Sequence, residues 1–220
     1  MIAKDIVSNL LPPLKTSDTG EKALLWMHEF GVNHMPIVNN EQYLGIITED
    51  DILDMSEPLA PIGSYELSLS KPSVNERIHI YEVIRIVVDQ KLTLLPVVDD
   101  KENYMGVISL DLILKYFASV SAITESGGII ILELSKKQYS LSEIARIVES
   151  EDAIVLSAYV NSTQDNSMLE VTLKLNTPDI RAIVASLERY EYVIKGSYQE
   201  NEYLGELKDR FDSLMNYLNI

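Results

Sequence analysis

The chain has 220 residues, of which 46% are hydrophobic, and this apolar content is sufficient for one large domain or two small ones. It contains no cysteine, which excludes disulfide bonds, thiolate nucleophiles and cysteine metal sites. The net charge of −16 is shared between −9 in residues 1–120 and −7 in residues 121–220, and without a basic patch neither direct nucleic-acid binding nor attraction to an anionic membrane is expected.

The first predicted helix lies before residue 31, where four apolar residues recur at helical spacing. These residues are Ala23, Leu24, Met27 and Phe30. Thr16 and Asp18 are the candidate caps at its start, because a side-chain oxygen there can accept a hydrogen bond from a free backbone N–H. A β-branched run over 36–38 then predicts a strand that ends in an Asn-Asn turn, and a second strand is predicted over 43–47.

A second helix is predicted directly after these strands. Thr48 takes the N-cap position and Asp51 follows three residues later, which is the spacing of a capping box. Glu49 and Asp50 complete an acidic first turn, where the helix dipole favours negative charge. The predicted order is therefore helix, strand, strand, helix.

The same pattern recurs about sixty residues later in the chain. The segment HMPIVNNEQYLGIITEDDIL of residues 34–53 aligns with LLPVVDDKENYMGVISLDLIL of residues 94–114, so that Pro36 matches Pro96. After one inserted residue, Thr48 matches Ser109. Internal repetition of this kind marks structural units that bury their faces against each other.

Each copy resembles the CBS motif, which has a proline-led apolar strand, a glycine, a Ser or Thr three residues later and an Asp three residues beyond that. The first copy matches in full, because Gly45, Thr48 and Asp51 occupy these positions. The second copy keeps the glycine and Ser109 but has Leu112 in place of the Asp.

The resemblance covers residues 1–120, with motif one over about 1–58 and motif two over about 59–120. It implies an α/β (α+β) fold in which tandem CBS motifs form one pseudo-twofold module. It also implies two clefts between the motifs, which in this family commonly hold adenosine-containing ligands.

The resemblance assigns roles to residues of these clefts. The carboxylate that binds ribose hydroxyls would be Asp51, and the hydroxyl that reaches ribose or phosphate would be Thr48 in the first copy and Ser109 in the second. Residues just before each strand proline are implied to line the adenine slot. These residues are Asn33, His34, Met35, Leu94 and Leu95.

The second cleft departs from the motif at the ribose acceptor, because Leu112 cannot accept a hydrogen bond. Charge-assisted hydrogen bonds contribute about 1.5–3 kcal/mol each, so this cleft is expected to bind weakly or to bind another ligand. Asp111 lies one residue early, which turns its side chain away by about 100° on a helix. At most one competent site per chain is expected.

The first cleft is acidic, because Glu49 and Asp50 stand where many CBS motifs have a basic residue. A multiply charged phosphate meets repulsion there unless helix N–H groups or a bridging Mg²⁺ offset it. AMP, another adenosine derivative or S-adenosylmethionine is therefore expected rather than metal-free ATP. Thr48 and Asp51 cap the helix whether or not a ligand binds. A run of acids at a helix start is more often a solvated surface than a metal site, and no metal is expected.

The pattern changes after a polar connector over residues 121–126. Hydrophobic spacing and helix caps predict six further elements. They are a strand over 129–134, a helix capped by Ser140, strands over 153–160 and 168–175, a helix that begins at Thr177-Pro178, and a strand over 192–198. The order βαββαβ is a split βαβ arrangement.

This order, over residues 127–200 and behind a CBS pair, looks like a ferredoxin-like ACT-like domain. Amino-acid-binding ACT domains usually have a glycine in the turn after the first strand, whereas the turn here, 135–139, has none. Dimerisation or coupling between domains is therefore expected more than amino-acid binding. Residues 201–220 predict a C-terminal helix with one apolar stripe. The stripe consists of Leu204, Leu207, Phe211, Leu214 and Leu218.

No enzyme activity is expected, because His28, His34 and His79 share no metal-ligand spacing and no nucleophile elbow, phosphate-binding loop or dinucleotide fingerprint occurs. Paired carboxylates remain an unsupported alternative. No cleavable leader and no run of about 18 apolar residues is found, so a cytoplasmic location without membrane contact is expected.

The combination of a CBS pair and an ACT-like tail is similar to acetoin-utilisation accessory proteins. It predicts a regulatory protein that senses an adenosine-type ligand and acts on a protein partner through a homodimer. The alternative is a scaffold that binds no ligand and mediates homo- or hetero-association, which the degenerate second motif favours.

Overall fold

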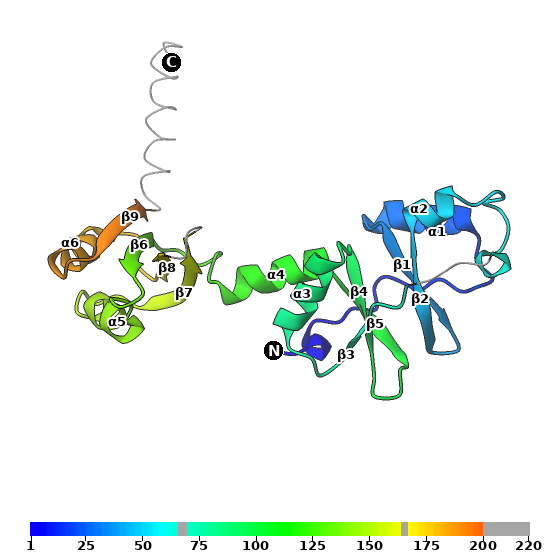
Figure 1. Cartoon of the computed structure of the whole chain (residues 1–220), viewed down its shortest axis with the longest axis horizontal. Helices are drawn as coiled ribbons and strands as arrows, with labels where there is room; N and C mark the ends of the chain where they lie inside the picture. The colour runs from blue at the N-terminus through cyan, green and yellow to red at the C-terminus, as the bar shows by residue number, and fades with distance from the viewer. Residues whose placement is uncertain (66–69, 164–166, 200–220) are drawn as a thin grey trace, which may run out of the picture. The chain divides into compact units, whose positions relative to one another are not determined.

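The computed structural model describes residues 1–65, 70–163 and 167–199. The chain forms two compact units, Met1–Tyr116 and Phe117–Ile220, each of which combines helices with strands (Figure 1). The expected α+β class is confirmed. The helix predicted over 201–220 lies outside the described residues.

The first unit contains the two copies of the helix, strand, strand, helix pattern. The first copy consists of α1 (Gly20–Phe30), β1 (His34–Asn39), β2 (Gln42–Thr48) and α2 (Glu49–Leu53). The second consists of β3 (Val74–Asn75), α3 (Ile80–Asp89), β4 (Leu94–Val98), β5 (Tyr104–Ser109) and α4 (Leu110–Val120), of which the last four residues fall in the second unit. Short 3-10 helices, η1 (Ala3–Asp5) and η2 (Ile62–Ser64), precede α1 and β3.

The two copies have the same strand pairing. In both hairpins the antiparallel register shifts at one place, between Ile37 and Val38 in the first and between Val97 and Val98 in the second. A parallel neighbour lies beside each hairpin, since Leu14 bridges to Ile37 and Val74 pairs with Val97. The sequence repeat is therefore a structural repeat.

The segments that lead into each motif cross to the other motif. Ser8 forms an antiparallel bridge with Val107 of β5, and Ser70 forms the corresponding bridge with Ile46 of β2. The backbone N–H groups of Ser8 and Ile46 donate at 2.9 Å to Val107 and Ser70 respectively. The two motifs are therefore joined by backbone pairing as well as by side-chain packing.

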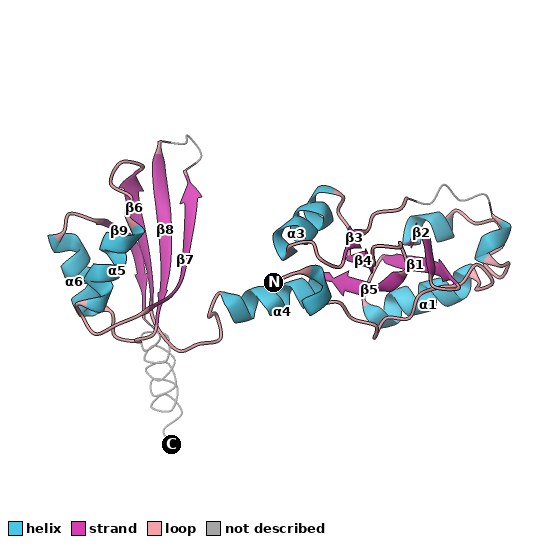
Figure 2. Ribbon diagram, turned by 90° about the horizontal axis from the view of Figure 1, so that it is seen from below, coloured by secondary structure: helices cyan, strands magenta, loops and turns pink. Residues whose placement is uncertain are grey.

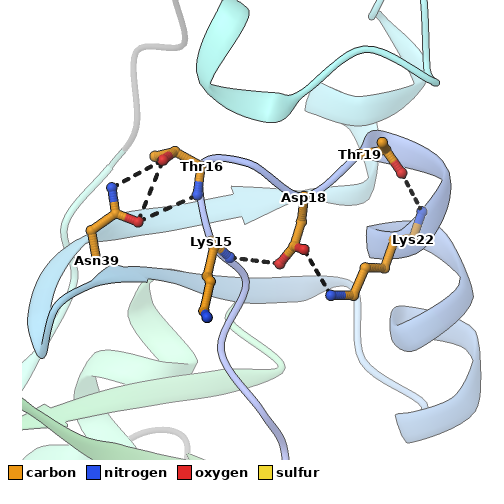
Figure 3. Close-up of polar contacts among 6 residues, drawn as sticks. All are labelled: Lys15, Thr16, Asp18, Thr19, Lys22 and Asn39. Atoms are coloured by element: carbon orange, nitrogen blue, oxygen red, sulfur yellow. Dashed lines mark hydrogen bonds and ion pairs between the residues drawn. The ribbon is translucent and has the colours of Figure 1, made fainter.

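The start of α1 differs from the prediction. Thr19 is its N-cap, and the Thr19 hydroxyl accepts from the N–H of Lys22 at 3.2 Å (Figure 3). Thr16 contacts Asn39 instead. The Asp18 carboxylate accepts from the N–H of Lys15 and from Lys22 Nζ. The predicted caps Thr16 and Asp18 are therefore wrong. The reason is that Asp18 folds back onto the turn before the helix, which leaves Thr19 at the first helical turn.

The second unit is a four-stranded antiparallel sheet with two helices. Its elements are β6 (Ile129–Ser135), α5 (Leu141–Glu149), β7 (Val155–Ser162), β8 (Met168–Leu175), α6 (Arg181–Arg189) and β9 (Val193–Tyr198). The strand order is β7-β8-β6-β9, and α5 and α6 lie beside one face of the sheet (Figure 2). Ile130, Leu132 and Leu134 alternate with less buried residues and belong to the core of this unit. The predicted βαββαβ order is confirmed.

Two details of this unit differ in position. α6 begins at Arg181 and not at Thr177-Pro178, because the Asp179 carboxylate accepts from the N–H and guanidinium of Arg181 and ends the preceding loop. β7 runs from Val155 to Ser162, whereas the predicted strand covers 153–160. Within the described ranges, no helix has the length and apolar character needed to cross a membrane.

Candidate ligand-binding site

A cavity of about 340 Å³ lies inside the first unit, where parts of both motifs meet. Its apolar wall comes from the N-terminal segment, the end of α1, and β5 with the start of α4. These apolar residues include Leu10, Phe30, Val32, Val107, Leu110 and Leu112. The volume is within the range of about 300–1,000 Å³ of small-molecule sites, in which an apolar wall carries a few polar groups.

The polar groups of the cavity are three hydroxyls and one ion pair. Ser8, Thr93 and Ser109 supply the hydroxyls, and the Lys115 Nζ lies 2.6 Å from the Asp111 carboxylate. Ser109 also begins α4, since its Oγ accepts from the N–H of Leu112 at 3.4 Å. The predicted binding residue Ser109 is thus at the cavity.

Leu112 and Asp111 both line the cavity, but they differ in chemical character and in their partners. Leu112 contributes to the apolar wall, whereas Asp111 is 66% exposed and engaged by Lys115. Asp111 therefore does not replace the missing carboxylate in this arrangement.

Thr48 and Asp51 form the predicted capping box at the start of α2. The Thr48 N–H and Oγ1 donate to Asp51 Oδ2 at 2.8 and 2.7 Å, and the Asp51 N–H donates to Thr48 Oγ1 at 3.1 Å. Neither residue lines the 340 Å³ cavity. Their capping role is established, and their contact with a ligand stays a prediction.

Asn33 and His34 lie at the seam between the motifs. The Asn33 N–H donates to Thr93 Oγ1 at 3.0 Å, and His34 Nδ1 lies 2.9 Å from the same hydroxyl. The Thr93 N–H donates to His34 Nδ1 at 3.3 Å. Burial lowers the pKa of His34, and the nearby Asp51 carboxylate raises it to a smaller extent. Asn33 also borders a second hollow, together with Glu49.

The other three predicted slot residues are core residues. Met35, Leu94 and Leu95 have 0% exposed surface. In this conformation they lie behind the surface that a ligand could touch, and a contact with them would require neighbouring side chains to move.

The sequence prediction missed Thr93, Phe30 and Lys115. Thr93 had a signal, because it stands about sixty residues after Asn33 and therefore at the same position of the repeat. Phe30 fits the apolar face of the first predicted helix, which gives no sign of a cavity. Lys115 lies one turn of α4 beyond Asp111 and is outside the motif positions. In the described part of the chain, no group of three or more His, Asp or Glu residues is suited to hold a metal ion.

Comparison with known proteins gives partial matches over most of the chain. An inosine-5'-monophosphate dehydrogenase of Methanocaldococcus jannaschii is 24% identical over 204 residues, which cover 87% of this chain and 38% of that protein. The chain thus spans well under half the length of this curated relative.

Similar solved structures include a CBS domain pair/ACT domain protein of Thermotoga maritima, with 22% identity and a TM-score of 0.48 over 54% of this chain and 98% of that one. They also include CBSX2 in complex with AMP, with 16% identity and a TM-score of 0.46 over 54% of this chain and 97% of that one. The model of the CBS domain family matches residues 3–57 and 65–119, which together make up half of the sequence. The chain therefore belongs to the CBS domain family and contains two tandem CBS domains.

Proposed function

We propose that this protein is a regulatory ligand sensor that binds an adenosine-containing molecule between its two CBS motifs. The observation that carries the proposal is the 340 Å³ cavity beside Ser109, because residues of both motifs form its wall. A ligand held there contacts both motifs at once, and its binding energy can favour one arrangement of them over another.

The character of the cavity supports a ligand with a flat apolar ring and a polar or anionic end. Phe30, Val32 and Val107 offer apolar surface to the ring. The Ser109 hydroxyl lies at the start of α4, where the positive end of the helix dipole favours an anion. AMP, another adenosine derivative and S-adenosylmethionine are candidates of this type. The first cleft, with Asn33, Thr48 and Asp51, stays a second proposed contact region.

Exposed leucines on the helices of the first unit support a homodimer. Leu25 on α1, Leu53 on α2 and Leu114 on α4 are 61%, 64% and 68% exposed. Burial of this apolar surface against a second copy of the chain stabilises the dimer. Size-exclusion chromatography with light scattering measures the mass, and a monomer at micromolar concentration contradicts this part of the proposal.

The receiver of the signal is proposed to be a protein partner. The proposal includes a similarity of domain order to acetoin-utilisation accessory proteins, which would favour a regulatory role over a catalytic one. The alternative, a scaffold without a ligand, shares the dimer but not the cavity function.

Replacing Leu112 by tryptophan tests the cavity, because the larger ring fills the space beside Ser109. Titration calorimetry with AMP, adenosine and S-adenosylmethionine should give binding to the natural chain and at least a tenfold loss in L112W. Leu112→Met keeps the volume and should bind as the natural chain does. A ligand at 100 times its dissociation constant should also stabilise the fold by about 2.7 kcal/mol. The scaffold alternative is favoured if none of these molecules binds.

A further inference from the structure

We propose that His34 and Thr93 form a pH-sensitive latch between the two CBS motifs, closed while the imidazole is neutral and weakened when Nδ1 takes a proton. The latch consists of three hydrogen bonds across the seam: Asn33 N–H to Thr93 Oγ1, Thr93 N–H to His34 Nδ1, and the contact between Thr93 Oγ1 and His34 Nδ1. It needs no ligand to operate.

The contact of the Thr93 N–H with Nδ1 favours one tautomer of the neutral His34 ring. A backbone N–H can only donate, so the Nδ1 that lies 3.3 Å from Thr93 N must carry a lone pair, and the proton of the neutral ring must be on Nε2. The Thr93 hydroxyl already accepts from Asn33 N–H, which leaves its own hydrogen free to point at Nδ1. The N–H and the hydroxyl of Thr93 therefore share the single lone pair of Nδ1 in the neutral ring, at 3.3 and 2.9 Å.

Protonation of Nδ1 removes this arrangement. The new N–H faces the N–H of Thr93, which loses its acceptor, and the hydroxyl must turn to accept instead of donate. An N–H left without a partner in a half-buried seam is destabilising.

The surroundings set the direction of the switch. Asp51 on α2 favours the protonated ring, whereas burial favours the neutral ring and outweighs it. Thr48, opposite His34 in β2, and Thr93, ahead of β4, carry no charge. The pKa of His34 in the folded protein lies below the ordinary value of a histidine. The latch is therefore intact at pH values above the ordinary pKa, and it is lost as the pH falls through the lower pKa of the folded protein.

The latch joins the starts of the two helices that carry the motif hydroxyls. The Asn33 carbonyl accepts from the N–H of Glu49, the first residue of α2, at 3.0 Å, and the Thr93 carbonyl accepts from Leu110 of α4 at 3.2 Å. Thr93 also lines the cavity. Opening of the latch therefore loosens one wall of the cavity and its connection to the first motif.

Hydrogen exchange of the full-length protein tests the latch at the Asn33 and Thr93 amides. Their protection factors should be constant above pH 6.5 and fall by up to about tenfold per pH unit below it. In His34→Asn, which keeps an acceptor but does not titrate, they should stay constant. His28→Asn, at an exposed residue of α1, should behave as the natural chain, and the Val38 amide, bonded to Leu14, should not respond.

Nitrogen-15 spectra of the imidazoles supply a measurement that needs no substitution in the latch. At neutral pH, His34 should have its proton on Nε2. The proposal is overturned if Nδ1 carries the proton, if the two amides show pH-independent protection in the natural chain, or if His34→Asn retains the pH dependence.

Discussion

Replacing Gly106 by alanine should both destabilise the first unit and distort the cavity. Gly106 lies in β5 with φ 138°, a conformation that costs a non-glycine residue about 1–3 kcal/mol. An added Cβ would lie 2.6 Å from the Ser8 carbonyl oxygen and 2.6 Å from Asn9 Oδ1. The crossing segment must then move away from β5, which adds about 1–3 kcal/mol as in other overpacked sites. The expected loss is about 2–6 kcal/mol.

Gly31→Ala is the matched control for this substitution. Gly31 also has a positive φ, 64°, but no atom lies within 4 Å of its added Cβ. It should therefore lose only the backbone contribution, about 1–2 kcal/mol. The backbone contributions of the two variants are of similar size, so most of the difference between them reports the contact with the crossing segment.

Urea unfolding followed by tryptophan fluorescence measures both variants, because Trp26 is the single tryptophan and lies on α1 in the first unit. If Gly106→Ala and Gly31→Ala lose equal stability, the segment around Ser8 does not pack on β5 and the reasoning is refuted. Weaker AMP binding in Gly106→Ala should accompany the loss, since Ser8 lines the cavity.

Two further pairs of substitutions, measured by thermal or urea unfolding, test the core of the second unit and the helix caps of the first. Leu132→Ala should destabilise the second unit by about 2–5 kcal/mol, because Leu132 is 0% exposed in its core, and Leu141→Ala, at a 44% exposed residue, should have a much smaller effect. Thr48→Ala should lower the free energy of unfolding by about 0.5–2 kcal/mol, because Thr48 makes the full capping box of α2. Ser109→Ala should lower it by less, because the Ser109 hydroxyl accepts only from the N–H of Leu112, at 3.4 Å. If Thr48→Ala and Ser109→Ala lose equal stability, the capping box of Thr48 and Asp51 contributes no more than a single side-chain cap.

The repeat made most of the first unit predictable. Strand and helix positions follow from local patterns, namely the β-branched runs after Met35 and Leu95 and the hydroxyl-acid spacing of Thr48 and Asp51. These signals depend on residues close in sequence, and the structure keeps them. The second unit was predictable for the same reason, since the alternation in 168–175 corresponds to β8 residue for residue.

The parts that could not be predicted depend on residues far apart in sequence. The bridges of Ser8 to Val107 and of Ser70 to Ile46 are single pairs without any periodic signal. The cavity depends on these bridges, because the N-terminal segment supplies part of its wall. For the same reason Thr93 was missed as a link between the motifs, although its position in the repeat was visible.

The charge difference between the repeats explains why we place an anionic ligand beside Ser109, although the other copy matches the motif better. The start of α2 carries Glu49, Asp50 and Asp51, whereas the corresponding residues of α4 are Leu110, Asp111 and Leu112. Lys115 neutralises Asp111, so the start of α4 has no net charge from these groups. A phosphate bound at the start of α2 meets repulsion from all three carboxylates, and at an effective dielectric constant of about 20 each pair of unit charges costs about 4 kcal/mol at a separation of about 4 Å and less at longer range. That penalty exceeds the 1.5–3 kcal/mol of one charge-assisted hydrogen bond that Asp51 could offer to a ribose. A neutral adenosine derivative escapes the penalty, so the two clefts are expected to differ in the charge of the ligand they accept and not only in affinity.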